Sequence, residues 1–297
     1  MTRNRAASLL LLAAAVWGLA FLFQKSAMRH VGPLTFIAAR GVVATLALAP
    51  LAWREVQRSS LPRPLGLLRW SLAGGLLFFL AAALQQSGLQ TATVTNSGFL
   101  TALYVVITPL IAWGVSRAAP RGFVWLGVAL SAFGTWLLGG ASFSSFSLGD
   151  AQVAASSVFW AAHVVITGRA ARFGRPLAFT LIGFVLVALL GSVGAFTLET
   201  PSMTGLARAA LDIAYVGVMS SAFAFLLLIV ALQHLPPAEG AIIASTETLF
   251  AASAAYLFLG EHLPALGWAG AALILAASVL VQVGPALAGG ARLAPPA

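Results

Sequence analysis

The chain has 297 residues, of which 60% are hydrophobic and 8% are charged, and its formal net charge is +9. A mean hydropathy of +0.98 is typical of an integral membrane protein and argues against a soluble one. Because the sequence contains no cysteine, disulfides, thiol catalysis and cysteine metal sites are excluded, and the four histidines are too scattered for us to expect a metal or cofactor site.

Apolar runs follow one another along the chain, starting with an uncharged run at 6–23 that would resemble a signal peptide on its own. Nine further runs argue against that interpretation, since each has about the length a helix needs to cross the ~30 Å hydrocarbon layer. Short turns with Pro and Gly separate the runs and leave no room for a soluble domain. The sequence therefore predicts an all-α membrane protein of ten transmembrane helices, at 6–23, 34–53, 70–89, 96–115, 122–138, 149–168, 176–198, 209–231, 239–259 and 264–283.

Positive residues are distributed unevenly between the two sides of this arrangement. With the N-terminus in the cytoplasm, that side carries all but four of the 16 Lys and Arg residues, the exceptions being Lys25, Arg29, Arg40 and Arg208. The positive-inside rule therefore predicts that both termini are cytoplasmic. Because the arginines lie in short connections, they are interpreted as topology signals, and no nucleic-acid partner is expected.

An internal repeat divides the chain into halves at 6–140 and 147–285, with a tail at 286–297 that we expect to be disordered. Each half contains five predicted helices, and an odd number makes the second half cross the membrane in the opposite sense. Such inverted repeats place a transporter's site near the bilayer midplane, where the two halves meet. An offset of 143 residues aligns Trp17 with Trp160, Pro33 with Pro176, Phe36 with Phe179 and Gly127 with Gly270.

Five stretches occur in the order and with the spacing of a known family. They are AVWGLAFLFQK, GPLTFIAARGVVA, TNSGFLTALYVVITPL, SSVFWAAHVVITGRAA and IASTETLFAASAAYLFLGEHLPALGWAGAALILAASVLV. In these stretches the chain resembles the EamA-like family of the drug/metabolite transporter superfamily. The resemblance implies ten helices in two inverted copies, and transport or export of small metabolites such as amino acids across a bacterial inner membrane. It does not name a substrate.

One departure from the family pattern lies in the ninth predicted helix. The family often has Glu-Pro there, whereas Glu247 is followed by Thr248, so no proline kink is expected. The fourth helix retains Pro109, which leaves the Val105 carbonyl without its helical donor and predicts a local bend.

Glu247 lies near the middle of the ninth helix, where a charge costs roughly 2.5–3.5 kcal/mol unless it faces a partner or a watery cavity. The 143-residue offset maps Tyr104 onto it, so we expect the two side chains to face each other in a cavity. A carboxylate whose hydration changes between inward and outward states would also load and release a proton. The alternative is a structural acid that is hydrogen-bonded to a neighbouring helix.

Trp17 and Trp160 lie about halfway across the membrane, although tryptophan favours the interfaces. We expect them to form an aromatic wall of the cavity, the alternative being tight packing between helices rich in small residues. His163 lies three residues after Trp160 on the same helical face, and either lines the cavity or makes a structural hydrogen bond.

Arg40 is predicted to lie about 10 Å below the outer surface, where it would meet a substrate carboxylate, pair with an acid or extend outward. Gln85, Gln86 and Asn96 are placed at the mouth of the cavity, although capping and loop hydrogen bonds explain them equally well. Small-residue pairs such as Gly127 with Ser131 fit either packing between the halves or a homodimer.

Together these features favour a secondary transporter that works by alternating access, with protons as a second partner. An enzyme is not expected, because neither a nucleophile with its base nor a metal-binding motif is found. A receptor would usually carry a soluble domain or long loops. Glu247 favours a cation, a zwitterion or proton coupling, whereas Arg40 is compatible with anions, so a zwitterionic metabolite satisfies both. Proton-coupled efflux of cationic drugs or amines and a non-coupled facilitator remain alternatives.

Overall fold

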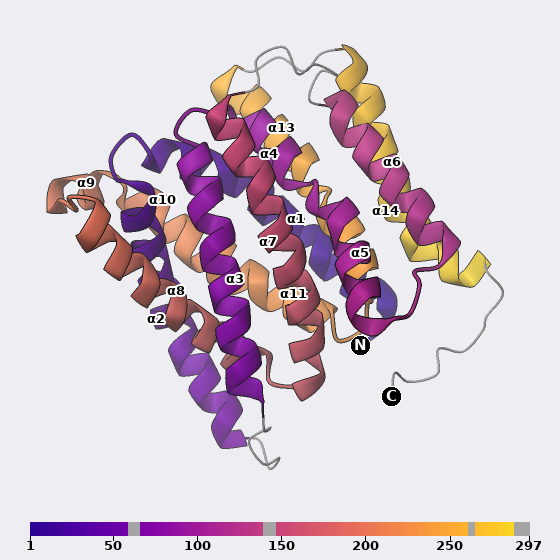
Figure 1. Cartoon of the computed structure of the whole chain (residues 1–297), viewed down its shortest axis with the longest axis horizontal. Helices are drawn as coiled ribbons and strands as arrows, with labels where there is room; N and C mark the ends of the chain where they lie inside the picture. Colours follow the sequence, from indigo (N-terminus) through magenta and orange to yellow (C-terminus); the bar gives the residue numbers. More distant parts are fainter. Residues whose placement is uncertain (59–65, 139–146, 261–264, 288–297) are drawn as a thin grey trace.

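The computed structural model describes residues 1–58, 66–138, 147–260 and 265–287, and all regular structure in these ranges is helical (Figure 1). Within these ranges nine helical segments are long and apolar enough to cross a membrane, which confirms the all-α membrane fold. The other predicted span is α6 (Gly122–Leu138), an apolar helix of 17 residues at the lower limit of about 17 for a transmembrane helix. The count of ten therefore stays a prediction.

Five of the long spans are single α-helices, and a sixth, α7, continues into a short 3-10 turn. They are α1 (Arg3–Ala27), α2 (Pro33–Arg58), α3 (Leu67–Gly88), α7 (Leu148–Ala170) followed by η1 (Ala171–Phe173), α8 (Pro176–Leu198) and α14 (Ala265–Leu287). The tail predicted at 286–297 thus begins inside α14, and its residues 288–297 lie outside the described part of the chain.

The eighth span changes its winding partway along. A short helix, α9 (Met203–Arg208), precedes it, and the span itself consists of α10 (Ala210–Tyr215), the π-helical segment η2 (Val216–Ala224) and α11 (Phe225–Ala231). π-helical segments are rare and often occur at functional sites.

The fourth and ninth spans are broken near their middles at equivalent positions. The fourth consists of α4 (Val94–Thr101) and α5 (Tyr104–Ser116), and the ninth of α12 (Pro237–Ala244) and α13 (Glu247–Leu259). An offset of 143 residues converts the bounds of α4 and α5 into those of α12 and α13. The repeat seen in the sequence therefore recurs in the backbone, and it places two interrupted helices at the middle of the bundle.

The expectation that the ninth span has no kink is wrong. Hydroxyl groups at the break replace the missing proline: Ser245 Oγ donates to the Ile242 carbonyl and Thr246 Oγ1 to the Ile243 carbonyl, both at 2.8 Å. Such bonds to carbonyls one turn back compete with the backbone ladder and bend helices. The interruption thus occurs without proline, at a position where two hydroxyls bond to backbone carbonyls.

The main helix pairs each join one predicted half to the other. α2 packs along α8, α6 along α14 and α3 along α7, while α1 packs against α13. In Figure 1 the pair α6–α14 lies at one side of the bundle and α2 with α8 at the other, with α1 and α7 between them. The centre of the bundle is therefore built from both halves.

Helix directions give the bundle two ends. At one end, which we call the terminal face, α1 begins and α14 ends, and Arg3 Nη2 donates to the Val281 carbonyl at 2.7 Å. Arg3 also forms a salt bridge with Glu239 there. At the other end, the opposite face, Asn96 Nδ2 lies 3.4 Å from Asp150 Oδ1. Asn96 is the repeat counterpart of Glu239, so equivalent positions of α4 and α12 are held at opposite faces.

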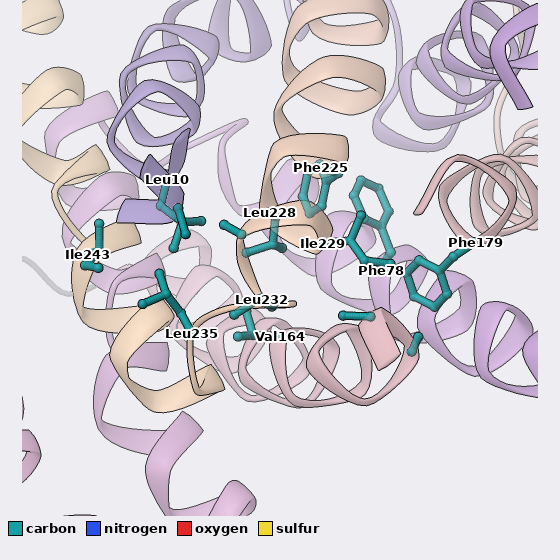
Figure 2. Close-up of a cluster of buried hydrophobic side chains, with 14 of the residues drawn as sticks. Leu10, Phe78, Val164, Phe179, Phe225, Leu228, Ile229, Leu232, Leu235 and Ile243 are labelled. Atoms are coloured by element: carbon teal, nitrogen blue, oxygen red, sulfur yellow. The ribbon is translucent and has the colours of Figure 1, made fainter. Parts of the chain in front are cut away.

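A cluster of buried apolar side chains fills the bundle between its middle and the terminal face. Figure 2 shows Leu10, Leu228, Leu232, Leu235 and Ile243 directed toward one another, and none of them is more than 5% exposed. These side chains come from α1, α11, α12 and the turn between α11 and α12. These apolar side chains therefore fill the space between the middle of the bundle and the terminal face.

Candidate functional site

A buried cavity of about 60 Å³ lies at the middle of the bundle, beside the two helix breaks. Its wall is formed by residues of α1, α2, α3 and α7, of the broken fourth and ninth spans and of the partly π-helical eighth span. The six residues that the sequence assigns to a cavity all line this one: Trp17, Arg40, Tyr104, Trp160, His163 and Glu247. Their roles in binding remain predictions.

Glu247 is the first residue of α13, and its side chain is 5% exposed. The Tyr104 hydroxyl lies beside its carboxylate, while Glu247 Oε1 has no partner among the described residues. The amide groups at the start of α13 add the partial positive charge of a helix N-terminus beside it. The Oε1 atom of Glu247 is thus available to a ligand.

Arg40 carries the opposite charge into the same cavity. Its side chain is 3% exposed, Nε donates to Ser221 Oγ at 2.9 Å, and the guanidinium carbon lies 5.4 Å from the centre of the Phe78 ring. Within the described residues no carboxylate forms a salt bridge with it, so the alternative of a structural ion pair is not seen there. The π-helical segment η2 provides Ser221, which orients the guanidinium.

The two midplane tryptophans make related contacts. Trp17 Nε1 donates to the Ser220 carbonyl of η2 at 3.1 Å, and Trp160 Nε1 donates to Gln85 Oε1 of α3 at 2.6 Å. Both rings pack against Phe225, with centroid distances of 4.9 Å for Trp17 and 5.8 Å for Trp160. The cavity therefore has an aromatic wall in which each indole N–H is already bonded.

His163 belongs to the wall but has little freedom to bind a ligand. Its Nδ1 lies 3.0 Å from the Gly74 carbonyl, which can only accept, and its Nε2 lies 3.3 Å from Thr167 Oγ1. Because both ring nitrogens have partners, the structural hydrogen-bonding role is favoured over direct contact with substrate.

The three residues predicted at the cavity mouth occupy different positions. Gln85 lines the cavity itself, whereas Gln86 is 1% exposed and donates to the Gln24 carbonyl at 3.1 Å, joining α3 to α1. Asn96 lies at the opposite face, near Asp150. The structure therefore brings Gln85, but not Gln86 or Asn96, together with the charged residues.

Sequence reasoning missed two residues of the wall that matter chemically. Thr101, at the end of α4, lines the cavity, and its hydroxyl has no partner among the described residues. Its position three residues before Tyr104 was the available signal, because that spacing puts both on one helical face. Phe225 lines the cavity as well, but phenylalanine is so common in membrane helices that its depth carried no signal.

Comparison with known proteins finds one family profile that matches this chain twice in succession. The sequence profile of the EamA-like transporter family matches twice, at residues 4–140 and 147–283, so the two matches are offset by 143 residues. An uncharacterized transporter from Archaeoglobus fulgidus is 28% identical over 286 residues, which are 92% of this chain and 84% of the relative.

Two further similarities agree with this match. The uncharacterized transporter YwfM of Bacillus subtilis is 24% identical over 288 residues, covering 93% of both chains. A solved crystal structure of a protein superposes on this chain with a TM-score of 0.76 at 19% identity, and the match covers 98% of this chain and 100% of the other. At that identity the solved structure supports the fold alone.

Proposed function

This chain belongs to the EamA-like transporter family, and we propose that it is a secondary transporter that moves a small zwitterionic metabolite, such as an amino acid, out of the cell. One observation carries the choice of substrate class. Glu247 and Arg40 line the same buried cavity, and neither forms a salt bridge among the described residues. A zwitterion brings a cation for the first and an anion for the second.

Electrostatics favours a bound zwitterion in this cavity over two buried charges without a charged partner. A buried ion is costly unless it is paired and hydrogen-bonded, and here each charge has only neutral partners, Tyr104 and Ser221. A bound ammonium group would satisfy the available Glu247 oxygen, and a bound carboxylate would satisfy the guanidinium N–H groups of Arg40. The aromatic wall of Trp17 and Trp160 would cover the rest of the ligand.

We propose alternating access as the mechanism, around a site that lies where the repeats at 6–140 and 147–285 meet. The equivalent breaks in the fourth and ninth spans support this, because interrupted helices beside a central site are the usual construction of inverted-repeat transporters. The apolar cluster around Leu10 and Leu232 would close the terminal side while the site faces the other way. The positive-inside rule supports a cytoplasmic terminal face in a bacterial inner membrane, since Arg54, Arg58, Arg117 and Arg169 all lie there.

A second candidate is the efflux of cationic amines in exchange for protons. The available Glu247 oxygen and the aromatic rings beside it favour this substrate, because aromatic faces attract cations. Under this alternative Arg40 would serve only to position Phe78 and Ser221.

The experiment that separates these functions uses purified protein in liposomes, challenged with a pooled metabolite extract with and without a pH gradient. We expect zwitterions to be enriched. Replacing Arg40 with Gln should lower their transport about tenfold or more, the effect of losing a charged hydrogen bond, with little change in the transport of simple amines. Selective transport of amines that is insensitive to Arg40→Gln would favour the second candidate.

A further inference from the structure

Three buried polar atoms that lack hydrogen-bond partners among the described residues occur close together in the fold. They are Glu247 Oε1, Thr101 Oγ1 and Ser97 Oγ, on side chains that are 5%, 4% and 0% exposed. Buried polar atoms are nearly always paired with protein or water, so each exception needs an explanation. Bound water is the simplest partner for all three.

The three groups follow one line from the middle of the bundle toward the opposite face. Glu247 and Thr101 line the same cavity. Ser97 lies four residues before Thr101 in α4, which puts it on the same helical face, about 6 Å nearer the opposite face. α4 also packs closely on α13, because a Cβ built on Gly98 would lie 3.2 Å from Ala251 Cβ. Two buried hydroxyls without partners among the described residues thus lie one helical turn apart on α4, the one nearer the middle lining the cavity with the carboxylate.

The equivalent path on the terminal side is apolar. The 143-residue offset maps Ser97 onto Gly240 and Thr101 onto Ala244, and both of these line the cavity without a hydroxyl. Beyond them lie Leu10 and Ile243 of the apolar cluster (Figure 2). At these two pairs of positions only the first half carries hydroxyl groups that could hold water.

We infer that Ser97 and Thr101 form a proton access path from the opposite face to Glu247. Along this path the proton moves through a short row of water molecules. This inference rests on the proposed proton coupling at Glu247. A hydronium ion at the opposite face gives up one proton, each water or hydroxyl accepts one proton and donates another, and the last proton binds Glu247 Oε1. The net change is one neutralised carboxylate and one water molecule left behind.

The volume and the surrounding groups are compatible with this path. A cavity of about 60 Å³ exceeds the roughly 10–15 Å³ that a single water requires. The other charged or titratable groups at the cavity come from three elements. Tyr104 from α5 lies beside the carboxylate, His163 from α7 has a partner at each ring nitrogen, and Arg40 from α2 donates to Ser221.

The remaining elements around Glu247 bring no other ionisable group to the cavity wall. Within the described residues, α1 contributes Trp17, Phe21 and Gln24, α12 contributes Gly240, Ala241 and Ala244, and α14 meets α13 through Ile274 beside Ala252. Proton exchange on this route therefore ends at Glu247.

The test compares isosteric variants that remove only a hydroxyl, in liposomes that contain the full-length protein and a pH-sensitive dye. We expect Thr101→Val combined with Ser97→Ala to slow the proton flux driven by the pooled metabolite extract about tenfold or more, the effect of two lost hydrogen bonds in the transfer path. Because Thr101 also lines the cavity, the readout for the double variant is the ratio of proton flux to substrate exchange without a pH gradient, and this ratio should fall. Ser97 lies outside the cavity lining, so Ser97→Ala alone should leave that exchange at the wild-type rate. Thr101→Ser, which keeps a hydroxyl, should restore proton flux and serves as the folded comparison if the valine variant is unstable.

Thr108→Val provides a matched control in the same span. Its hydroxyl is also buried but donates to the Tyr104 carbonyl at 2.7 Å, on the terminal side of the break, so proton flux should be unchanged. If Glu247→Gln abolishes proton flux while the Ser97 and Thr101 variants keep it, the access path is wrong and the proposed coupling stands. If Glu247→Gln keeps proton flux, the proposed coupling itself is wrong and the path falls with it.

Discussion

Glu55 and Glu199 make the same contact at opposite faces of the bundle. Each lies near the C-terminal end of one helix of the antiparallel α2–α8 pair, and its carboxylate caps the first turn of the other helix. Glu199 accepts from two α2 amides, both at 2.8 Å, and Glu55 accepts from two α8 amides at 3.1 and 2.9 Å. The amides belong to Leu34, Thr35, Leu177 and Ala178.

The first prediction follows from this pair of caps. Replacing either glutamate with Ala should destabilise the protein by about 0.5–2 kcal/mol, because helix N-terminal amides lose their acceptor. Glu199→Ala should cost more than Glu55→Ala, since Glu199 also accepts from Thr35 Oγ1 at 2.6 Å and the equivalent position in α8 is Ala178. Thermal unfolding in detergent measures both, with the neighbouring exposed Thr200→Ala as control. An equal or reversed order would contradict the structural reason.

A second prediction concerns Glu247 in the transport cycle. Glu247→Gln mimics the protonated acid, so it should lose accumulation driven by a pH gradient but keep substrate exchange. Glu247→Asp should retain partial coupling with a shifted pH optimum, because its carboxylate is shorter and sits differently in the cavity. Both are measured in liposomes with and without an imposed gradient. If the Gln variant still concentrates substrate against its gradient, proton coupling through Glu247 is wrong, and a non-coupled facilitator explains the protein better.

The third prediction tests the aromatic wall. Trp17→Ala and Trp160→Ala should each impair transport while the folded protein remains detectable in the membrane, since these rings line the cavity. Trp268→Ala is the matched control, because that side chain is 70% exposed on the outer surface of α14 and should not affect transport. If activity falls only in proportion to protein abundance, packing explains the tryptophans.

A fourth prediction addresses the close approach of α1 and α13. A Cβ built on Gly18 would lie 2.7 Å from the Glu247 carbonyl oxygen and 2.8 Å from the Ala251 amide nitrogen. Gly18→Ala should therefore force the helices apart and destabilise the protein by about 1–3 kcal/mol, seen as a lower melting temperature. Gly114→Ala, where a Cβ meets nothing within 4 Å, should be neutral or slightly stabilising. An unchanged melting temperature of Gly18→Ala would contradict this prediction and show that α1 and α13 can move apart at little cost.

The fifth prediction concerns topology. Reporter fusions at Gly140 and Pro201 should lie outside the cell, and fusions at Pro62, Arg172 and the C-terminus inside, as the arginine distribution requires. Because the chain has no native cysteine, single introduced cysteines provide a second measurement with no background. Termini on opposite sides of the membrane would overturn the ten-span topology and the inverted repeat with it.

Depth along a helix could be predicted from the sequence, but rotation about its axis mostly could not. The midplane positions of Trp17 and Trp160 follow from residue counting, and the repeat offset brings Tyr104 to Glu247. Gln85 and Gln86 are neighbours at one depth, yet only Gln85 lines the cavity. A membrane helix is apolar toward lipid and toward its neighbours alike, so its sequence carries no strong polar face from which to read rotation.

The break in the ninth span shows a second limit. Proline marks a kink visibly because it removes a donor, whereas Ser245 and Thr246 act through bonds that depend on side-chain rotamers. The same residue types occur in unbroken helices, as at Ser156 in α7, whose hydroxyl bonds the Val153 carbonyl at 2.6 Å. Composition alone therefore could not separate a bent helix from a straight one.

Packing across the two halves has a consequence for biosynthesis. Because α2 packs on α8 and α6 packs on α14, the helices that are synthesised first lack their main packing partners until the second half of the chain is inserted. Neither half owns a complete core, so cutting the chain between residues 140 and 147 would leave two fragments that depend on each other. Assembly must then be completed late, when α14 docks on α6 and encloses the helices inserted before it.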